Sequence, residues 1–507
     1  MRLNFLVPAA LLLLAALTTQ FFLSYATVPS DRLLYDSAVF LARDPASFQG
    51  DVFIDVFAGN YVGRGVFSLL AALPFDPLLS ENVLAVICRC LYVLGFFFLA
   101  KAMWRDDRIA FVSGLFALFT PGVSGGETVY LFSPRALVYA FYPAFFLVCH
   151  KYLETKRRSL VIIAVAMLAL FAFVHLMSVV PLVLFIAAYL IVNDRTRKTA
   201  LAIGIAATVL VLGYIQFFDH GFPAATVDIA RPYQFEFNYF SDARWMVITA
   251  FGAAISLTGI WLTRKRMFSK VAFVWHCLLL LYFTLASLLA FADPKFFALL
   301  PWRVVVYLTA LSPLYLGVLY AAAAKRGRAF LLGSVMLFLV AFAVLGTSNA
   351  FVTYYEKTLV GGDTYDKLCA QGTPLDGLLR CDTPEGAWNL RKTRSFFDAC
   401  AAVPKAPAGL VMAPVDEAVF VRLCAKRGIV VSTKDHSVGL VSSPAFIEWL
   451  SRYGIVKDAY EDGSEPLFAV AERYDATVVV TNADDARSTP GWSLVYRNVL
   501  YKVWIRS

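Results

Sequence analysis

The chain is 507 residues long, 60% hydrophobic and only 16% charged, with a mean hydropathy of +0.67. Soluble globular proteins carry about 25% charged residues, so this composition excludes a wholly soluble chain. The formal net charge of +9 does not indicate nucleic-acid binding, because the basic residues of the first 350 positions cluster in short connectors between apolar runs.

The apolar runs, most of them 17 to 23 residues long, are predicted to be transmembrane helices. A helix rises about 1.5 Å per residue and the hydrocarbon core of a bilayer is about 30 Å thick, so each run can span it. The uncharged stretch 159–193 is too long for one crossing and is predicted to form two helices that turn near His175 and Pro181. A half-helix is predicted at 66–74. The predicted spans, about eleven, are 4–24, 82–104, 109–121, 135–152, 159–175, 176–193, 199–218, 245–263, 271–292, 303–324 and 329–349.

The charges of the connectors predict the orientation. With the N-terminus inside, the inner connectors hold 18 Lys or Arg against 4 Asp or Glu, and the outer ones hold 8 basic against 13 acidic residues. The positive-inside rule then predicts a cytoplasmic N-terminus in a bacterial inner membrane. A signal peptide cleaved near Ala26 is an alternative for the first helix, but the apolar run is rather long for one, so we expect a retained helix.

With a cytoplasmic N-terminus, an odd number of spans places the C-terminus on the opposite side of the membrane. The predicted domains are therefore a membrane domain at 1–350, with a periplasmic first loop at 25–65, and a periplasmic α/β domain at 351–507. Within the latter, strands are predicted at 409–412, 429–432 and 477–481, helices at 415–427 and 444–453, and a hairpin at 492–505 with its turn at 497–498. This alternation predicts a small three-layer α/β sandwich.

Four of the eight cysteines lie in the exported region, where an oxidising compartment permits disulfides. Local pairing joins Cys369 to Cys381 and Cys400 to Cys424. Four cysteines allow three connectivities, and four free buried thiols are the other alternative. No pair has CxxC spacing, so neither a zinc site nor a redox motif is predicted.

The first outer loop is acidic. Asp31 can cap a helix whose apolar residues recur at helical spacing as far as Pro45, which predicts an amphipathic helix on the outer membrane surface. Asp36 and Asp51 are among the acids around it. A carboxylate held at the membrane boundary can deprotonate an acceptor hydroxyl. The alternative is that these acids are solvated loop charges and helix caps.

The outer basic residues are few and unusually placed. Arg89 lies inside the second span, where an unpaired charge is expensive and a partner or polar cavity is expected. Arg135 and Arg303 begin the fourth and tenth spans. Together with Arg64 and Arg231 they could form a cationic site for a phosphate near the outer leaflet. Internal ion pairs and interfacial anchoring are the alternative.

Two further residues are candidates for substrate binding. His175, where the fifth span meets the outer surface, could act as an acid or base, although a helix-capping or hydrogen-bonded structural histidine is the commoner case. Glu127 follows the Gly-rich connector before the fourth span. The aromatic and polar residues that alternate at 231–240 suit stacking on a sugar, or anchoring in the membrane interface.

This layout resembles the GT-C superfamily of integral-membrane glycosyltransferases. The shared features are a first helix entering from inside, an acidic first outer loop with a juxtamembrane helix, about eleven spans and an exported α/β domain. The stretch that begins at Tyr35-Asp36 looks like the family's loop in which an aspartate opens an amphipathic helix. Phe132-Ser-Pro-Arg135 and Pro301-Trp-Arg303 look like arginine-bearing segments of bacterial members.

The chain also departs from the family pattern. It has no DxD motif, no Asp-Glu pair in the first loop and no WWD-type motif. These absences argue against an oligosaccharyltransferase, and they leave the cofactor, including any divalent metal, unassigned.

The resemblance implies a polytopic α-helical membrane protein of GT-C-like fold that takes a sugar from a polyprenyl phosphate or diphosphate. Asp36 would be the first candidate for general base and Asp51 the second. The expected activity is inverting transfer to a cell-envelope glycan or lipid at the periplasmic face, with donor, acceptor and membrane lipids as partners and no nucleic acid. The substrate-binding candidates are Arg64, Arg89, Glu127, Arg135, His175, Arg231 and Arg303.

Three other functions are left open by the sequence. One is a polymerase or ligase for lipid-linked glycans, in which the outer arginines and His175 matter more than Asp36. Another is a transporter or flippase, which the scarcity of charges at midplane depth and the absence of an obvious inverted repeat disfavour. The third is a non-catalytic subunit of a polysaccharide export system.

Overall fold

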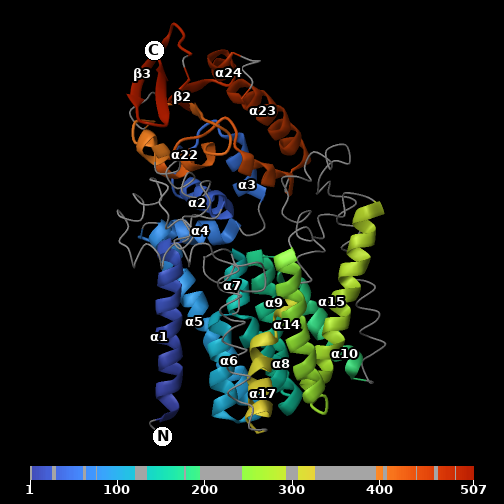
Figure 1. Cartoon of the computed structure of the whole chain (residues 1–507). Helices are drawn as coiled ribbons and strands as arrows, with labels where there is room; N and C mark the ends of the chain where they lie inside the picture. Colours follow the sequence, from blue (N-terminus) through green and yellow to red (C-terminus); the bar gives the residue numbers. More distant parts are fainter. Residues whose placement is uncertain are drawn as a thin grey trace, which may run out of the picture. The chain divides into compact units, whose positions relative to one another are not determined.

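The structure is a computed structural model (Figure 1), and the elements below lie within the residues it describes. These residues are 3–25, 30–60, 64–75, 77–119, 134–175, 178–193, 243–292, 306–325, 395–403, 408–440, 442–461, 466–485 and 487–507. The chain divides into two compact units. The first comprises Met1–Ala26, Leu79–Asp219 and Gln234–Ser348, and the second comprises Thr27–Leu78, His220–Tyr233 and Asn349–Ser507.

Every element of secondary structure that the structure describes in the first unit is a helix. Five stretches there are long and apolar enough to cross a membrane: Val83–Trp104, Pro134–Thr155, Arg158–His175, Met267–Leu289 and Tyr307–Ala324. The labelled elements are α1 (Leu3–Tyr25), α5 (Pro77–Trp104), α6 (Asp107–Phe119), α7 (Pro134–Ala140), α8 (Tyr142–Thr155), α9 (Arg158–His175), α10 (Val180–Val192), α14 (Ala243–Leu262), α15 (Met267–Ala292), η5 (Val306–Thr309) and α17 (Ser312–Ala324).

The protein is therefore a polytopic membrane protein, as predicted. Shorter apolar helices at Leu6–Leu17, Val180–Val192 and Thr249–Leu262 coincide with further predicted spans. The number eleven stays a prediction, since the spans at 199–218 and 329–349 lie outside the described residues.

Large apolar side chains are exposed on these helices, among them Leu13, Ile162, Phe173 and Leu288. Such a surface would be unfavourable in water but is expected where lipid is the solvent. Small residues allow close helix contacts. A Cβ atom at Gly317 of α17 would lie 2.7 Å from the carbonyl oxygen of Ile109 in α6. Close approach at small residues is typical of packing between membrane helices.

Two predicted spans are interrupted near prolines. The span predicted at 135–152 divides at Phe141 into α7 and α8, and Pro143 lies in the first turn of α8. The span predicted at 303–324 begins with the short 3-10 helix η5, and α17 has Pro313 in its first turn. Because proline lacks a backbone N–H and disfavours a helical residue before it, each helix restarts with proline near its N-terminus.

The second unit combines the first-loop helices with the C-terminal sheet. Its labelled elements are α2 (Ser30–Arg43), α3 (Val52–Asn60), α4 (Arg64–Ala72), β1 (Leu410–Met412), α22 (Ala418–Cys424), η8 (Thr433–Leu440), α23 (Ser443–Glu461), α24 (Leu467–Arg473), β2 (Ala476–Asn482), β3 (Trp492–Arg497) and β4 (Tyr501–Arg506). The α2 helix, which ends before Pro45, and the half-helix α4 confirm two predicted elements.

Most of the predicted C-terminal elements are present. β1 and β2 confirm the strands at 409–412 and 477–481, and β3 with β4 forms the predicted hairpin. The segment 429–432 is not a full strand, since it makes a single parallel bridge from Ile429 to Val411. Of the predicted helices, α22 is shorter than expected and α23 is longer, and α3 and α24 are not among the predicted elements.

Helices cover both faces of the sheet, whose strand order is β1-β2-β4-β3 with only β1 and β2 parallel. On one face, Val480 and its cross-strand partner Val503 pack with Phe396 and with α22. On the other face, the ring centroid of Trp504 lies 5.7 Å from that of Phe468 in α24. This is the predicted three-layer arrangement.

The first outer loop packs with the C-terminal residues. α2 contacts α3, α4 and α22, and α3 contacts η8 and α23. The rings of Tyr35, Phe57 and Phe67 join α2, α3 and α4, with centroids 5.9, 6.2 and 6.5 Å apart. The sequence-based division places this loop with the membrane domain, whereas its contacts place it in the second unit, because its apolar faces are buried there.

Candidate functional site

Asp36 lies in α2 with its side chain fully buried. Every residue from Asp36 to Phe40 is buried, so protein encloses α2 on more than one side. The helix therefore does not rest on a single apolar face, as an interfacial helix would, but packs among α3, α4 and α22. Removing a carboxylate from water is expensive, which marks Asp36 as a residue with a specific role.

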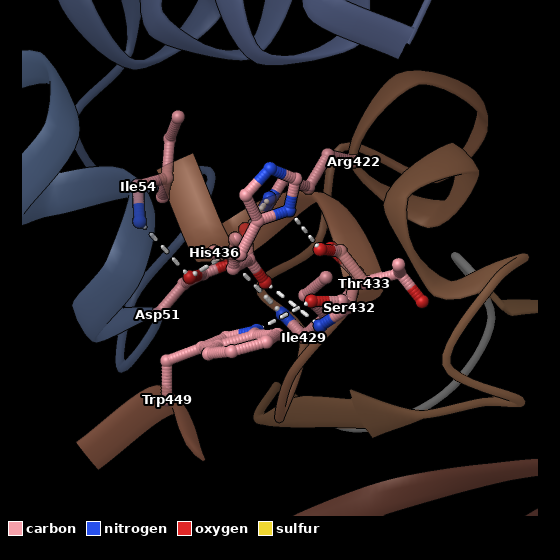
Figure 2. A network of polar contacts seen from close by, with 9 residues as sticks. Asp51, Ile54, Arg422, Ile429, Ser432, Thr433, His436 and Trp449 are labelled. Atoms are coloured by element: carbon pink, nitrogen blue, oxygen red, sulfur yellow. Dashed lines mark hydrogen bonds and ion pairs between the residues drawn. The ribbon is translucent and has the colours of Figure 1, made fainter. Parts of the chain in front are cut away.

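Asp51, at the N-terminus of α3, is also fully buried, and four hydrogen-bond donors surround it (Figure 2). Its Oδ1 atom accepts hydrogen bonds from the Ile54 N–H at 3.2 Å and from Nη2 of Arg422 at 2.9 Å. Its Oδ2 atom accepts from Nε of Arg422 at 2.8 Å and from the Ile429 N–H at 3.0 Å. Asp51 is thus the N-cap of α3 and the acceptor of a bidentate guanidinium.

Arg422 extends from α22 and joins Asp51 to a second carboxylate. Its Nη1 atom donates to Oδ1 of Asp435 at 2.6 Å, and the Ser432 N–H donates to Oδ2 of Asp435 at 2.8 Å. The Trp449 indole N–H donates to the Ser432 carbonyl at 2.8 Å, as Figure 2 shows. We call Asp51, Arg422 and Asp435 the buried triad, because none of the three side chains is more than 1% exposed.

The triad holds two carboxylates around one guanidinium. Burial raises the pKa of Asp435 and the Asp51 charge raises it further, while Arg422 opposes both effects. Burial alone would lower the pKa of Arg422, but Asp435 and Asp51 hold that pKa above its ordinary value. Since each oxygen of Asp51 already accepts two hydrogen bonds, this carboxylate suits a structural ion pair better than proton transfer. A catalytic role for Asp51 stays a prediction that this geometry does not favour.

The sequence carries a weak signal for Arg422, which was not among the candidates. It stands in an apolar part of the helix predicted at 415–427, with no acid three or four positions away. A basic side chain in that setting needs a partner from elsewhere in the chain. Which partner it takes is not visible in the sequence.

Arg64 begins α4 in the same unit and is exposed. Its Nη1 atom donates to the Gly59 carbonyl at 3.0 Å, a contact that joins the ends of α3 and α4 across a short connector. An exposed guanidinium remains accessible to a ligand, so the predicted phosphate contact is sterically open to it.

Two of the predicted arginines belong to the first unit. Arg89 is fully buried in α5, and Arg135 is 9% exposed in α7. Both lie in stretches apolar enough to cross a membrane. A buried arginine in such a helix is expensive and marks an ion-pairing or ligand-binding position.

His175 ends α9. Its Nδ1 atom lies 2.7 Å from the Ser178 hydroxyl oxygen and accepts the Ser178 N–H at 3.2 Å. With Nδ1 accepting a backbone N–H, the proton of the neutral ring resides on Nε2. This arrangement corresponds to the helix-capping alternative for His175.

A cluster of buried tyrosines in the first unit was not singled out from the sequence. The hydroxyl oxygens of Tyr139 and Tyr307 lie 2.6 Å apart, and the Tyr142 hydroxyl donates to the Ser178 carbonyl. The rings of Tyr142 and Tyr307 stack with centroids 5.9 Å apart. Tyr139 follows Arg135 by one turn of α7, so the two side chains share a face of that helix.

The other predicted site residues, Glu127, Arg231, Arg303, Cys369 and Cys381, lie outside the described residues. Cys400 and Cys424, one pair of the local pairing, form a disulfide with a Cα–Cα distance of 6.0 Å. In the part of the chain that the structure describes, no three His, Cys, Asp or Glu side chains gather to hold a metal ion.

No protein-family model matches the chain, and no curated protein matches its sequence. Among solved structures, the chain is similar to ArnT from Cupriavidus metallidurans bound to undecaprenyl phosphate, with 13% identity, a TM-score of 0.49, and 98% of this chain and 97% of that chain covered. It is also similar to the Archaeoglobus fulgidus oligosaccharyltransferase in complex with zinc and sulfate, with 14% identity, a TM-score of 0.46, and coverage of 94% and 68%. At these values the two likenesses assign no activity, and the proposals below rest on the chain's own residues.

Proposed function

We propose that the protein is a glycosyltransferase of the bacterial inner membrane that transfers a sugar from a polyprenyl phosphate or diphosphate to a cell-envelope glycan or lipid. Transfer takes place at the periplasmic face, on the side to which the connector charges assign the first loop and the C-terminal domain. The likeness of the first loop and of the arginine-bearing segments to GT-C enzymes supports this reaction class, and the membrane-crossing helices supply the setting for a lipid-linked donor.

Asp36 is the general base of the proposed reaction. Its carboxylate takes the proton of the acceptor hydroxyl while the hydroxyl oxygen attacks the anomeric carbon of the donor sugar. The bond from that carbon to the phosphate oxygen breaks, and attack from the opposite side inverts the configuration. Guanidinium groups such as those of Arg89 and Arg135 stabilise the charge that builds on the departing phosphate.

The burial of Asp36 within the first loop carries the proposal. Asp51 is occupied by Arg422 and two backbone N–H groups. Asp36 is not a member of the buried triad, yet it lies fully buried in the helix that opens the first loop. Burial keeps the carboxylate away from bulk water, a setting in which its electrostatic interactions are stronger. We therefore assign the base to Asp36.

The test is a transfer assay with the full-length protein in liposomes, polyprenyl-phosphate sugars and envelope acceptors. Asp36→Asn should lower the transfer rate by about 10²–10⁴-fold while the protein stays folded, because the amide keeps the shape but cannot accept the proton. Asp44→Asn is the matched control, since Asp44 is an exposed acid directly after α2 and should tolerate the change. Full activity of Asp36→Asn would refute the assignment of the base. Translocation of a lipid-linked sugar without any glycosidic product would replace the proposed function by a flippase.

A further inference from the structure

We infer that Arg422 is a positioning residue of the transfer reaction: through Asp51 it holds the first-loop helices, and with them Asp36, in one arrangement. The inference rests on the proposed function. If the inference holds, the C-terminal domain orients the first-loop helices that carry Asp36, and it is not a separate acceptor-binding module.

The ion pair between Arg422 and Asp51 is suited to fixing the position and orientation of the first loop. It joins residues 371 positions apart in the sequence. Arg422 approaches Asp51 with Nε and Nη2, a planar fork that sets orientation as well as distance. Both side chains are buried and hydrogen-bond each other, and each Asp51 oxygen already accepts two hydrogen bonds, so we expect any effect on transfer to act through other residues.

A short path leads from this contact to Asp36. Asp51 caps α3 through the Ile54 N–H, so the ion pair fixes the start of that helix. Further along α3, the ring of Phe57 lies 6.2 Å from the ring of Tyr35 in α2. Tyr35 directly precedes Asp36 in the sequence. A displacement of Asp51 therefore moves α3 and the packing partner next to Asp36.

The residues after Arg422 hold the loop at two more points. The Lys426 ammonium lies 4.9 Å from the centroid of the Phe40 ring in α2. At Gly428, a Cβ atom would lie only 3.1 Å from Cβ of Asp51 and 3.2 Å from the Phe48 carbonyl oxygen. A Cβ atom there would require its neighbours to give by a few tenths of an ångström, so the backbone of this segment packs directly on the residues around Asp51.

This close approach allows a replacement of the ion pair by a covalent link. Cβ atoms in disulfides lie about 3.5–4.5 Å apart, so Asp51→Cys combined with Gly428→Cys can bridge after a shift of a few tenths of an ångström. Arg422 keeps Asp435 as its partner in this double variant, and no charge is left buried alone. The oxidised double variant therefore holds the loop without the carboxylate.

The experiment measures kcat and the donor KM of full-length variants in liposomes. Arg422→Met and Asp51→Cys should each lower kcat by about 10²-fold, the cost of misplacing a catalytic group by about 1 Å. The donor KM should change less than kcat, since neither side chain of the ion pair is a proposed phosphate contact. Oxidation of the double variant should restore kcat to within about tenfold of the wild type, and reduction should abolish the gain.

Each outcome decides between roles. If Asp51 were a catalytic base, the double variant would be inactive in both redox states, because its carboxylate is gone. If the ion pair only stabilised the fold, the folded fraction of each single variant would transfer at the wild-type rate. Either result overturns the inference, and the cysteine variants decide it even if Arg422→Met fails to fold.

Two controls separate this inference from the proposed function. Arg487→Ala removes an ion pair with Asp485 that is remote from the triad in sequence and should leave kcat unchanged. Wild-type protein under the same reductant reports any effect of opening the Cys400–Cys424 disulfide. Absence of transfer by the wild type would refute the proposed function, whereas transfer by the wild type with undiminished activity of the variants would refute only the positioning role.

Discussion

The Cys400–Cys424 disulfide should contribute measurably to the stability of the C-terminal domain. It ties the helical segment 395–400 to α22, and both cysteines belong to or pack against the core cluster under the sheet. The sequence separation is 24 residues. Cross-linking a loop of that length lowers the conformational entropy of the unfolded chain and thereby raises its free energy by about 3.5 kcal/mol.

The perturbation is the double substitution Cys400→Ala and Cys424→Ala, which leaves no single reactive thiol behind. A loss of about 3.5 kcal/mol corresponds to a change of roughly 400-fold in the opening equilibrium, at about 1.36 kcal/mol per factor of ten. The slowest amides of β2 and β4 exchange through global opening of the domain, so their exchange rates should rise by that factor. Hydrogen-exchange mass spectrometry on the full-length protein measures these rates.

Cys277→Ser serves as the control, because Cys277 is an exposed free cysteine of the first unit. It should leave the exchange of β2 and β4 unchanged. Acceleration of less than about tenfold in the double variant would show that the cross-link does not act by restricting the unfolded chain, contrary to the loop-closure reasoning.

Three further predictions address other parts of the molecule. Arg135→Ala should raise the donor KM more than it lowers kcat, because its proposed partner is a phosphate charge. Arg264→Ala, at a connector predicted to be cytoplasmic, should not; equal effects of the two variants in a kinetic assay would remove Arg135 from the donor site. Burial works against ionisation of Asp485, but hydrogen bonds from Arg487 outweigh it and lower the pKa of this carboxyl below its ordinary value. Asp485 therefore adds stability above a pH of about 4 that is lost as pH falls through its folded pKa. The difference in melting temperature between wild type and Asp485→Asn should accordingly shrink below that pH, and a difference that grows there would contradict the sign. Cysteine labelling should place position 265 on the cytoplasmic side and position 485 on the opposite side, and the same side for both would overturn the orientation.

The elements that follow local rules were predictable. The hairpin of β3 and β4 has its turn at Asn498, whose side chain accepts the N–H groups of Leu500 at 2.9 Å and Tyr501 at 2.8 Å. Asparagine in a turn between two β-rich runs is a local signal that needs no distant partner. The break between α7 and α8 is likewise local, because Pro143 is visible in the sequence, although hydropathy alone joins the two helices into one span.

The buried triad was not predictable, because its partners are far apart in the chain. The apolar segment beginning at Ile429 looks like a strand, yet the Ile429 N–H donates to Asp51, 378 residues earlier, and a ladder of strand hydrogen bonds does not form. Because Arg422 is so distant in the sequence, Asp51 looks like an ordinary loop acid there, and its ion pair becomes apparent only in the structure. Local periodicity reports which face of an element is apolar, but not which distant charge that face will meet.

Asp51 and Arg422 are also synthesised at different times during translation. A ribosome adds about 5–20 residues per second, so the 371 residues between them take roughly 20–70 s to synthesise. Throughout that interval the first loop has been made but the segment that encloses it has not, and the ring of Phe53, which lies under Arg452 in the finished protein, has no cover from the C-terminal side. A nascent chain that stops before Arg422 can never complete its first loop. Maturation of the loop thus reports that translation has passed Arg422, and products truncated before it keep an apolar surface that proteases and chaperones recognise.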